Sequence, residues 1–170
     1  MTMTLYKDEI KTKDIVWTLY KTDKGVCLIE SDRDLPSFGE MFLTKVFGSY
    51  RLVKDEDQFT EERQQMHAFF EGKRTGLEFQ VQTFGTTFQK QVWEAVGRVP
   101  YGDTATYTDI ANMINRPTAI RAVSRAIGQN PLLIHCPCHR VIGKDGSLTG
   151  YRSGLSLKQS LLELENKNIR

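Results

Sequence analysis

The run Ile-His-Cys-Pro-Cys-His-Arg-Val-Ile-Gly at 134–143 constrains the fold of this chain more than any other stretch. It places the thiol of Cys138 between Pro137 and His139, and aliphatic residues come before and after these three positions. A cysteine on the open surface would not need the apolar neighbours, and a purely structural cysteine would not need the histidine and arginine. The run therefore predicts an activated thiolate held in a partly buried pocket.

The composition is typical of a folded protein that can build such a pocket. The chain has 170 residues, enough for one large domain or two small ones, and its charged residues (26%) are of both signs, which argues against disorder. No apolar run approaches the ~20 residues that a membrane-spanning helix needs, and the polar N-terminus lacks the apolar region of a signal peptide. We expect no membrane partner.

The cysteines indicate a reducing compartment. Cys27, Cys136 and Cys138 are an odd set without a secretory signal, which argues against a disulfide framework and predicts a cytoplasmic protein. His135, Cys136, Cys138 and His139 stand too close together for the usual tetrahedral ligand spacing, so we expect no metal site. We interpret Cys136 as a small buried apolar residue.

The first half of the chain has the pattern of a small α/β unit. Residues 14–20 and 26–30 are rich in β-branched and aromatic types, and Asp23-Lys24-Gly25 between them predicts a hairpin turn. Residues 58–70 have helical periodicity, and residues 77–83 alternate apolar and polar side chains as in a half-buried strand. None of these segments carries recognisable chemistry, so we interpret this half as a scaffold.

The second half is predicted to be mainly helical. Capping patterns at Thr86–Gln89 and Thr106–Asp109 open two helices, the second of them short. Asn115-Arg116-Pro117 breaks the chain before a further helix that runs to about Gly128. The inward apolar positions of these last two helices are Ile110, Met113, Ile114, Ala119, Ile120, Val123, Ala126 and Ile127.

The pair of helices on either side of this break has a helix-turn-helix pattern. Arg121, Ala122, Ser124 and Arg125 fall on the side of the second helix opposite the apolar positions. A short helix, a tight break and a helix with a basic outer face are typical of DNA binding. The pattern is unspecific by itself, because exposed arginines usually form an ordinary solvated face.

The last helix gives an independent indication of the site. Ser156 and Gln159 have capping spacing, and Leu157, Leu161 and Leu164 form an apolar stripe. Glu165 lies four residues past Leu161 and therefore projects from the buried side. Buried carboxylates need a partner, and His139 is the obvious one, although a solvated glutamate near the C-terminus is the alternative.

The segment Pro137–Val141 resembles the active-site signature of the O6-alkylguanine-DNA alkyltransferases, also called methylated-DNA–protein-cysteine methyltransferases. The resemblance extends from about Phe84 to Glu165, and the sequence is most similar to those of the bacterial members. The residues in the family's order and spacing are Tyr107, Arg121-Ala122-Val123, Asn130-Pro131, the Pro137–Val141 segment, Gly150-Tyr151-Arg152, Lys158 and Glu165.

The resemblance implies an α+β protein. It implies an N-terminal α/β scaffold domain with an antiparallel sheet, residues 1–84, and a mainly helical C-terminal domain with the helix-turn-helix and the reactive cysteine, residues 85–170. The activity it implies is direct repair of double-stranded DNA, in which the alkyl group of O6-alkylguanine passes irreversibly to Cys138. O4-alkylthymine is left open as a second substrate. It further implies a monomer, no cofactor and one turnover per molecule.

The resemblance also assigns catalytic roles. Glu165 orients His139, which takes the proton of Cys138 through a bound water, and the thiolate attacks the alkyl carbon of a guanine flipped out of the duplex. Tyr107 turns the target phosphate and donates a proton near O6. Backbone carbonyls near Cys138 and Val141 contact the exocyclic amine of the base.

The remaining roles concern DNA and the pocket. Arg121 inserts into the base stack, while Ala122, Ser124 and Arg125 belong to the helix that enters the minor groove. Asn130 is a hinge that ties this helix to the active-site loop. Tyr151 and Arg152 lie on the loop that closes the pocket.

Two other functions stay open on the residues alone. A non-catalytic binder of alkyl lesions is disfavoured because proteins of that kind lack the acceptor cysteine, and Cys138 is present. A thiol-based redox or metal sensor would use Cys136 and Cys138. The mass of the intact protein after incubation with methylated DNA separates all three hypotheses.

Overall fold

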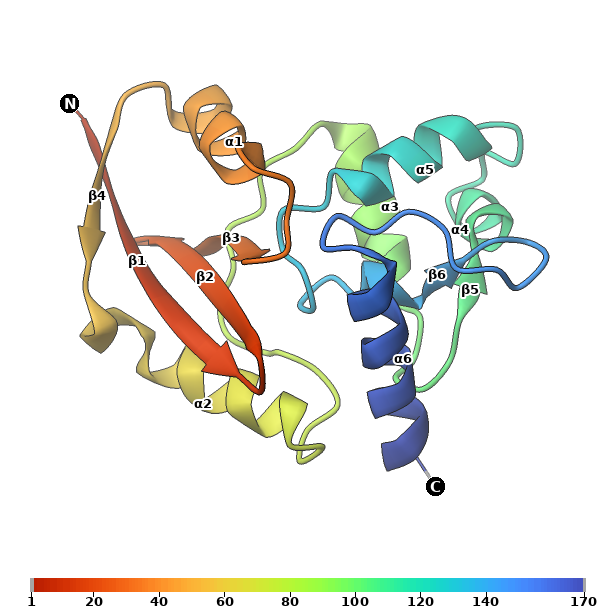
Figure 1. Cartoon of the computed structure of the whole chain (residues 1–170). Helices are drawn as coiled ribbons and strands as arrows, with labels where there is room; N and C mark the ends of the chain where they lie inside the picture. Colours follow the sequence, from red (N-terminus) through yellow and green to blue (C-terminus); the bar gives the residue numbers. More distant parts are fainter. Residues whose placement is uncertain (1, 170) are drawn as a thin grey trace. The chain divides into compact units, whose positions relative to one another are not determined.

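The computed structural model of the chain describes residues 2–169 (Figure 1). By its internal contacts the chain divides into two compact units, residues 1–84 and 85–170. The first unit holds the main sheet and the second is mostly helical, which confirms the predicted α+β class. Within residues 2–169 no helix is long and apolar enough to cross a membrane.

The first unit is built on a four-stranded sheet with the order β3-β2-β1-β4. The strands are β1 (Met3–Thr12), β2 (Ile15–Thr22), β3 (Gly25–Ser31) and β4 (Tyr50–Lys54). Strands β1, β2 and β3 pair antiparallel, as predicted, and the turn at 23–24 joins β2 to β3. Strand β4 differs and pairs parallel with β1, because helix α1 (Phe38–Phe47) carries the chain back before β4 begins.

The sheet is covered on both faces (Figure 1). Helix α1 packs through Leu43 onto a cluster with Leu5 and Leu28. The 3-10 turn η1 (Glu56–Phe59) leads into α2 (Thr60–Phe70), which contacts the opposite face, where Phe70 lies 5.6 Å from the Trp17 ring. The helix predicted over 58–70 is thus confirmed from residue 60 onward.

The strand predicted at 77–83 is wrong. This segment forms only a single bridge, between Val81 and Val26 of β3, with hydrogen bonds from the Val26 amide to the Gln80 carbonyl (3.0 Å) and from the Gln82 amide to the Val26 carbonyl (2.8 Å). Leu77 and Phe79 are buried although they lie outside any strand, and the Phe79 amide donates to Oε1 of Gln65 (3.2 Å). An alternating sequence pattern indicates that every second side chain is buried. A segment buried in this way does not have to pair with another strand.

The second unit consists of α3 (Thr87–Gly97), β5 (Ala105–Thr106), α4 (Tyr107–Met113), α5 (Ile120–Gly128), the 3-10 turn η2 (Cys138–Arg140), β6 (Val141–Ile142) and α6 (Leu155–Asn168). The short strands β5 and β6 pair in parallel, Ala105 with Val141 and Thr106 with Ile142. Because β5 runs directly into α4 and β6 follows η2, this pairing brings the start of α4 close to the turn that carries Cys138.

The helix starts follow the sequence in two of three places. Thr86 with Gln89 and Thr106 with Asp109 form complete capping boxes at α3 and α4. The cap predicted at Ser156 is wrong, because α6 begins at Leu155 and Ser156 lies inside it. The residue before the helix is Gly154 with φ +92°, a conformation that glycine adopts without strain, and it makes no side-chain cap.

The apolar face of the helix-turn-helix is narrower than predicted. Ile110 of α4 and Val123 and Ile127 of α5 are buried, as expected. Met113 and Ile120 are 38% and 39% exposed. They are the last residue of α4 and the first of α5, beyond the part of each helix that the neighbouring helices cover.

Candidate active site

Cys138 begins the tight turn η2, and its side chain is buried. The Cys138 amide donates to the Cys136 carbonyl (2.8 Å) and the Arg140 amide to the Pro137 carbonyl (2.9 Å). Ile134, four residues earlier, has φ +71°, a strained conformation for a β-branched residue. The chain before the cysteine is therefore fixed in a conformation that only its surroundings can maintain.

Asn130 supplies much of that constraint. Its side-chain Oδ1 accepts from the Leu132 amide (2.9 Å), and its Nδ2 donates to the Cys136 carbonyl (3.0 Å). The same Nδ2 lies 3.2 Å from the sulfur of Cys138. Asn130 thus ties the chain after α5 to the reactive turn and also gives the sulfur a hydrogen-bond donor.

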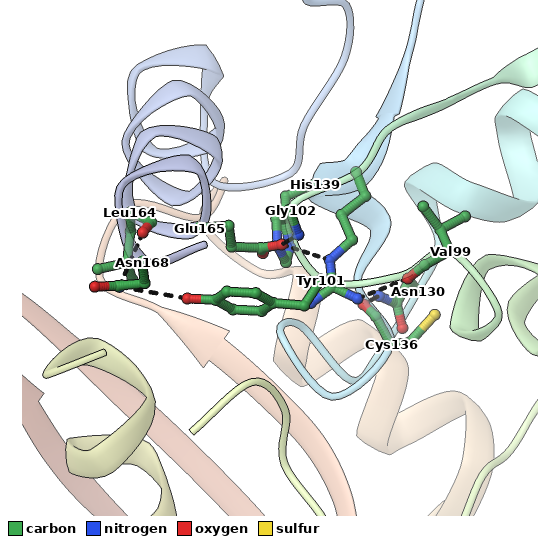
Figure 2. Close-up of polar contacts among 10 residues, drawn as sticks. Val99, Tyr101, Gly102, Asn130, Cys136, His139, Leu164, Glu165 and Asn168 are labelled. Atoms are coloured by element: carbon green, nitrogen blue, oxygen red, sulfur yellow. Dashed lines mark hydrogen bonds and ion pairs between the residues drawn. The ribbon is translucent and has the colours of Figure 1, made fainter. Parts of the chain in front are cut away.

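A buried cluster surrounds Glu165 of α6 and includes His139, the residue after Cys138 (Figure 2). Its Oε2 makes a short contact with Nε2 of His139, which is fully buried. Its Oε1 accepts from Nε of Arg140 (2.7 Å) and from the Gly102 amide (3.0 Å). Figure 2 also shows Tyr101, whose ring lies 5.5 Å from the Arg140 guanidinium.

The contacts of this cluster fix its protonation. Burial alone would raise the pKa of the Glu165 carboxyl, but the hydrogen bonds from His139, Gly102 and Arg140 outweigh it and leave the pKa below its ordinary value. Burial lowers the pKa of His139, so its imidazole is neutral at pH 7 despite the contact with Glu165.

The tautomer of His139 follows from the same contacts. A carboxylate only accepts hydrogen bonds, so Nε2 of His139 carries the hydrogen and Nδ1 carries the lone pair. Nδ1 is buried and has no hydrogen-bond partner among the described residues. His139 is therefore prepared to accept a proton at Nδ1.

The thiol of Cys138 experiences opposing effects. Burial raises its pKa above the ordinary value, while the Asn130 hydrogen bond and the positive charges of Arg152 and Lys158 act to lower it. Cys136 has a pKa raised well above the ordinary value by burial. Several groups act to lower the pKa of Cys138, whereas for Cys136 only the charge of Arg140 acts in that direction.

Cys138 opens onto a cavity of about 140 Å³. The cavity is lined by Tyr107, Ser124, Ile127, Gly128, Asn130, Leu133, Cys138, Gly150, Tyr151 and Arg152. It brings together residues that the sequence places on α4, α5, the chain after α5, η2 and the loop before α6. The size and mixed lining suit a planar polar ring with a small substituent.

Hydrogen bonds tie the loop before α6 to the other walls. The Tyr107 hydroxyl donates to the Thr149 carbonyl (3.2 Å) and accepts from the Thr149 hydroxyl (3.3 Å). Arg152 donates to the Asn130 carbonyl (2.7 Å). The loop therefore rests on both the start of α4 and the hinge asparagine.

The remaining site residues from the sequence lie outside this cavity. Arg121, Ala122 and Arg125 are exposed on α5, and of the residues on that surface only Ser124 reaches the cavity wall. His139 and Glu165 lie behind the cysteine, and Val141 is buried at the start of β6.

The structure adds two residues to the site. Arg140 belongs to the buried cluster, because it pairs with Glu165 and donates to the Val99 carbonyl (2.8 Å). Lys158 is completely buried, which was not predicted from the sequence. A signal exists, since Lys158 and Glu165 are seven residues apart and therefore share a helix face.

Among residues 2–169, no group of three or more histidine, cysteine, aspartate or glutamate side chains is placed to hold a metal ion. The cysteines at 27, 136 and 138 are all free.

The site combines a cysteine that faces a small cavity, a buried His–Glu pair and a helix-turn-helix. This combination is typical of a DNA-binding protein that transfers a group to a thiol. Residues 87–167 match the family described as "6-O-methylguanine DNA methyltransferase, DNA binding domain". The inducible methylated-DNA–protein-cysteine methyltransferase of Bacillus subtilis (strain 168) is 44% identical over 96% of this chain and 92% of the relative. The chain belongs to the methylated-DNA–protein-cysteine methyltransferase family.

Other similar proteins and structures support the same family. The methylated-DNA–protein-cysteine methyltransferase of Methanosarcina barkeri (strain Fusaro / DSM 804) is 48% identical over 69% of this chain and 75% of the relative. The crystal structure of Mycobacterium tuberculosis OGT in complex with DNA matches with a TM-score of 0.82 and 32% identity, covering 97% of this chain and 94% of that one. The likeness thus extends through both units.

Proposed function

We propose that this protein repairs DNA by transferring the alkyl group of O6-alkylguanine to the sulfur of Cys138. The observation that carries the proposal is the position of this sulfur, which faces a cavity of about 140 Å³ while Asn130 donates to it at 3.2 Å. The family relationship supports DNA as the partner and a cysteine as the acceptor.

The proton transfer begins at His139. Glu165 holds Nε2 of the imidazole, so Nδ1 takes the proton of Cys138. The thiolate then attacks the alkyl carbon, forming a carbon–sulfur bond as the carbon–O6 bond breaks, and the electron pair leaves with the guanine. The Tyr107 hydroxyl, on the cavity wall, donates a proton to the departing base.

The base must leave the duplex to reach the cavity. Unstacking costs a few kcal/mol, so a side chain has to fill the gap. Arg121 on the exposed surface of α5 has the length and charge for this, and Ala122 and Ser124 keep that surface flat enough for the minor groove. Arg125 contributes a phosphate contact from the same helix.

The loop before α6 closes the cavity around the base. Tyr151 and Arg152 line the wall opposite α5, and the Val141 carbonyl lies next to the reactive turn. We assign the carbonyl of Val141 to the exocyclic amine of guanine. O4-alkylthymine lacks that amine, so it is the weaker substrate if it is accepted at all.

The product ends the cycle. A thioether on Cys138 is not displaced by water at useful rates, so each molecule acts once. A free nucleophilic thiol of this kind persists in a reducing compartment, and we therefore place the protein in the cytoplasm.

The direct test is the mass of the intact protein after reaction with a duplex that contains one O6-methylguanine. We expect one added methyl group per molecule, located by peptide mapping on Cys138. The Cys138→Ser variant should lose transfer and keep lesion binding, while Cys27→Ala, which changes a cysteine of the other unit, should react normally. A methyl group on Cys136 or Cys27 would contradict the assignment, and binding without any mass change would favour a lesion binder.

A further inference from the structure

The loop between α3 and β5 contacts the buried cluster around Glu165 through three residues. The Val99 carbonyl accepts from Nη1 of Arg140 (2.8 Å), and the Gly102 amide donates to Oε1 of Glu165 (3.0 Å). Between these two contacts, the ring of Tyr101 lies 5.5 Å from the Arg140 guanidinium. The loop therefore holds both the arginine and the carboxylate of the cluster, although it is remote from both in the sequence.

Tyr101 is the residue of this loop that contacts the cluster through its side chain. Figure 2 shows its ring extending toward α6, where the Tyr101 hydroxyl accepts from Nδ2 of Asn168 (3.4 Å). Tyr101 is half-buried and does not line the cavity in front of Cys138. It is therefore not placed to touch a base in that cavity, and an effect on the reaction has to pass through the residues that it contacts.

Two elements fix the position of the Tyr101 ring. On the loop side, Gly102 has φ +84°, a conformation that glycine adopts without strain and that turns the chain toward the cluster. On the other side, the end of α6 packs closely, since a Cβ on residue 102 would lie only 2.8 Å from Cγ2 of Ile169. The Tyr101 ring thus lies between the last turn of α6, at Asn168, and the guanidinium of Arg140.

The Tyr101 ring completes the restraint on Arg140, which is buried. Two nitrogen atoms of the planar guanidinium form hydrogen bonds, Nε with Oε1 of Glu165 (2.7 Å) and Nη1 with the Val99 carbonyl. A cation within about 6 Å of an aromatic centroid is attracted to the face of the ring, and the attraction is stronger away from water. Tyr101 therefore opposes a rotation of the guanidinium away from Glu165.

The alignment of Arg140 matters because Glu165 is shared between two partners. Its Oε1 accepts from Arg140, while its Oε2 contacts Nε2 of His139. A carboxylate that turns to follow a displaced arginine moves both oxygens, so the contact with His139 changes as well. Burial acts to raise the pKa of Glu165, and the contacts from His139, Gly102 and Arg140 keep it below its ordinary value.

We propose that Tyr101 is a positioning residue for alkyl transfer, whose ring holds Arg140 in line with Glu165 and so keeps Glu165 directed at His139. The proposal rests on Cys138 as the acceptor and on His139 as the group that takes its proton. The rate of transfer then depends on the aromatic face of residue 101. The Tyr101 hydroxyl and the volume of the side chain contribute little.

The test is the single-turnover rate of methyl transfer from an O6-methylguanine duplex, measured over a range of duplex concentrations. This range separates the rate constant of transfer from the affinity for DNA. In Tyr101→Leu we expect ~10-fold slower transfer and unchanged affinity, because the proton acceptor acts on the chemical step. Tyr101→Phe keeps the ring and should keep most of the wild-type rate.

Tyr6→Leu is the matched control, since Tyr6 is a half-buried tyrosine of the other unit and its replacement should leave transfer unchanged. Equal losses in Tyr101→Phe and Tyr101→Leu would assign the effect to the hydroxyl contact with Asn168 and overturn the proposal. A wild-type rate in Tyr101→Leu would overturn it as well.

A double-mutant cycle tests the route through Glu165. If Tyr101 acts by directing this carboxylate, Tyr101→Leu should cause no further slowing in a Glu165→Gln background. A purely structural effect of Tyr101 would slow transfer by the same factor in both backgrounds. Such additivity would overturn the proposal.

A nearly isosteric series covers the case in which Tyr101→Leu does not fold. Phenylalanine analogues with increasing numbers of ring fluorines, placed at position 101, weaken the attraction of the ring face for a cation while changing its shape little. The rate should fall stepwise relative to Tyr101→Phe, and a constant rate across the series overturns the proposal. Absence of methylation at Cys138 in the wild type would refute the acceptor assignment itself.

Discussion

At the scale of single residues, the site separates a nucleophile from the group that accepts its proton. Asn130 contacts the sulfur of Cys138 directly, whereas Glu165 acts on His139 from behind. Burial and the positive charge of Arg140 lower the pKa of His139, while its contact with ionised Glu165 acts in the opposite direction. The cluster is buried, so its protonation is linked to folding.

This linkage predicts a loss of stability in acid. The pKa of His139 is lowered in the folded protein, so the unfolded chain binds the proton first as pH falls through the ordinary value of 6.5. The pKa of Glu165 is also lowered, and its contribution is lost at more acidic pH still. Urea unfolding from pH 8 to 5 should show a falling free energy of unfolding. In His139→Gln the part that begins near 6.5 should shrink, and an unchanged slope would contradict a neutral buried His139.

The Glu165→Gln variant tests whether Glu165 supports His139 as the proton acceptor. The amide neither stabilises an imidazolium nor pairs with Arg140, so we expect transfer to slow by ~10²-fold or more. A buried Arg140 left without its carboxylate should also cost about 3–5 kcal/mol of stability. Single-turnover rates and denaturant unfolding measure the two losses. Wild-type rates in this variant would remove Glu165 from the mechanism.

Arg121→Ala tests the role in base flipping. Repair in duplex DNA should slow far more than transfer from free O6-benzylguanine, because the free base does not have to leave a stack. Both rates are measured by mass spectrometry under single-turnover conditions. Equal losses on the two substrates would assign Arg121 to the pocket or to folding.

At the scale of elements, the helix-turn-helix presents its exposed surface while its other side packs on α3. Trp93 of α3 donates to the Ala126 carbonyl of α5 (2.8 Å), and the Cys136 thiol lies 3.7 Å from the Trp93 carbonyl. The DNA-facing helix and the reactive loop therefore share one support. The side chain of Asn130 links them directly, through hydrogen bonds with the Leu132 amide and the Cys136 carbonyl.

The surface of α5 predicts binding that depends on salt. Affinity for undamaged duplex should fall as salt rises, with little sequence preference, because the contacts go mainly to phosphates. Arg125→Ala should weaken binding to all sequences and lower the salt slope by about one. Arg98→Ala is the control, since Arg98 is engaged with Glu94 of α3 at 2.9 Å. Binding that ignores salt would argue against this surface.

At the scale of the whole molecule, reaction should reduce stability. The sulfur of Cys138 faces a cavity of about 140 Å³, and an alkyl group that outgrows this space should cost ~1–3 kcal/mol by overpacking. The thioether no longer accepts well from Nδ2 of Asn130. The alkylated protein is thus expected to be less stable than the unreacted one.

Melting curves of unreacted, methylated and benzylated protein test this expectation. Each kcal/mol lost lowers Tm by about 4–8 °C for a unit of this size, and the loss should grow with the alkyl group. Cys138→Ser incubated with the same DNA is the control and should not change. An equal or higher Tm after complete alkylation would refute a packed pocket, though not the transfer reaction.

The sequence by itself determined the features whose causes are local. The capping boxes at Thr86 and Thr106 are confirmed because a cap is decided within four residues. The amphipathic spacing placed Glu165 on the buried side of its helix, and the cysteine run located the thiol. These residues needed no knowledge of distant segments.

Only the tertiary structure decided the rest. Residues 77–83 alternate like a strand, yet only Val81 meets a partner, because pairing depends on where β3 runs. The burial of Arg140 and Lys158 was not predicted, because their partners lie far away in the sequence. The partner of Arg140 is Glu165, and those of Lys158 are the Val141 and Thr149 carbonyls. Burial of a charge depends on what the fold brings against it, and composition and periodicity do not contain that information.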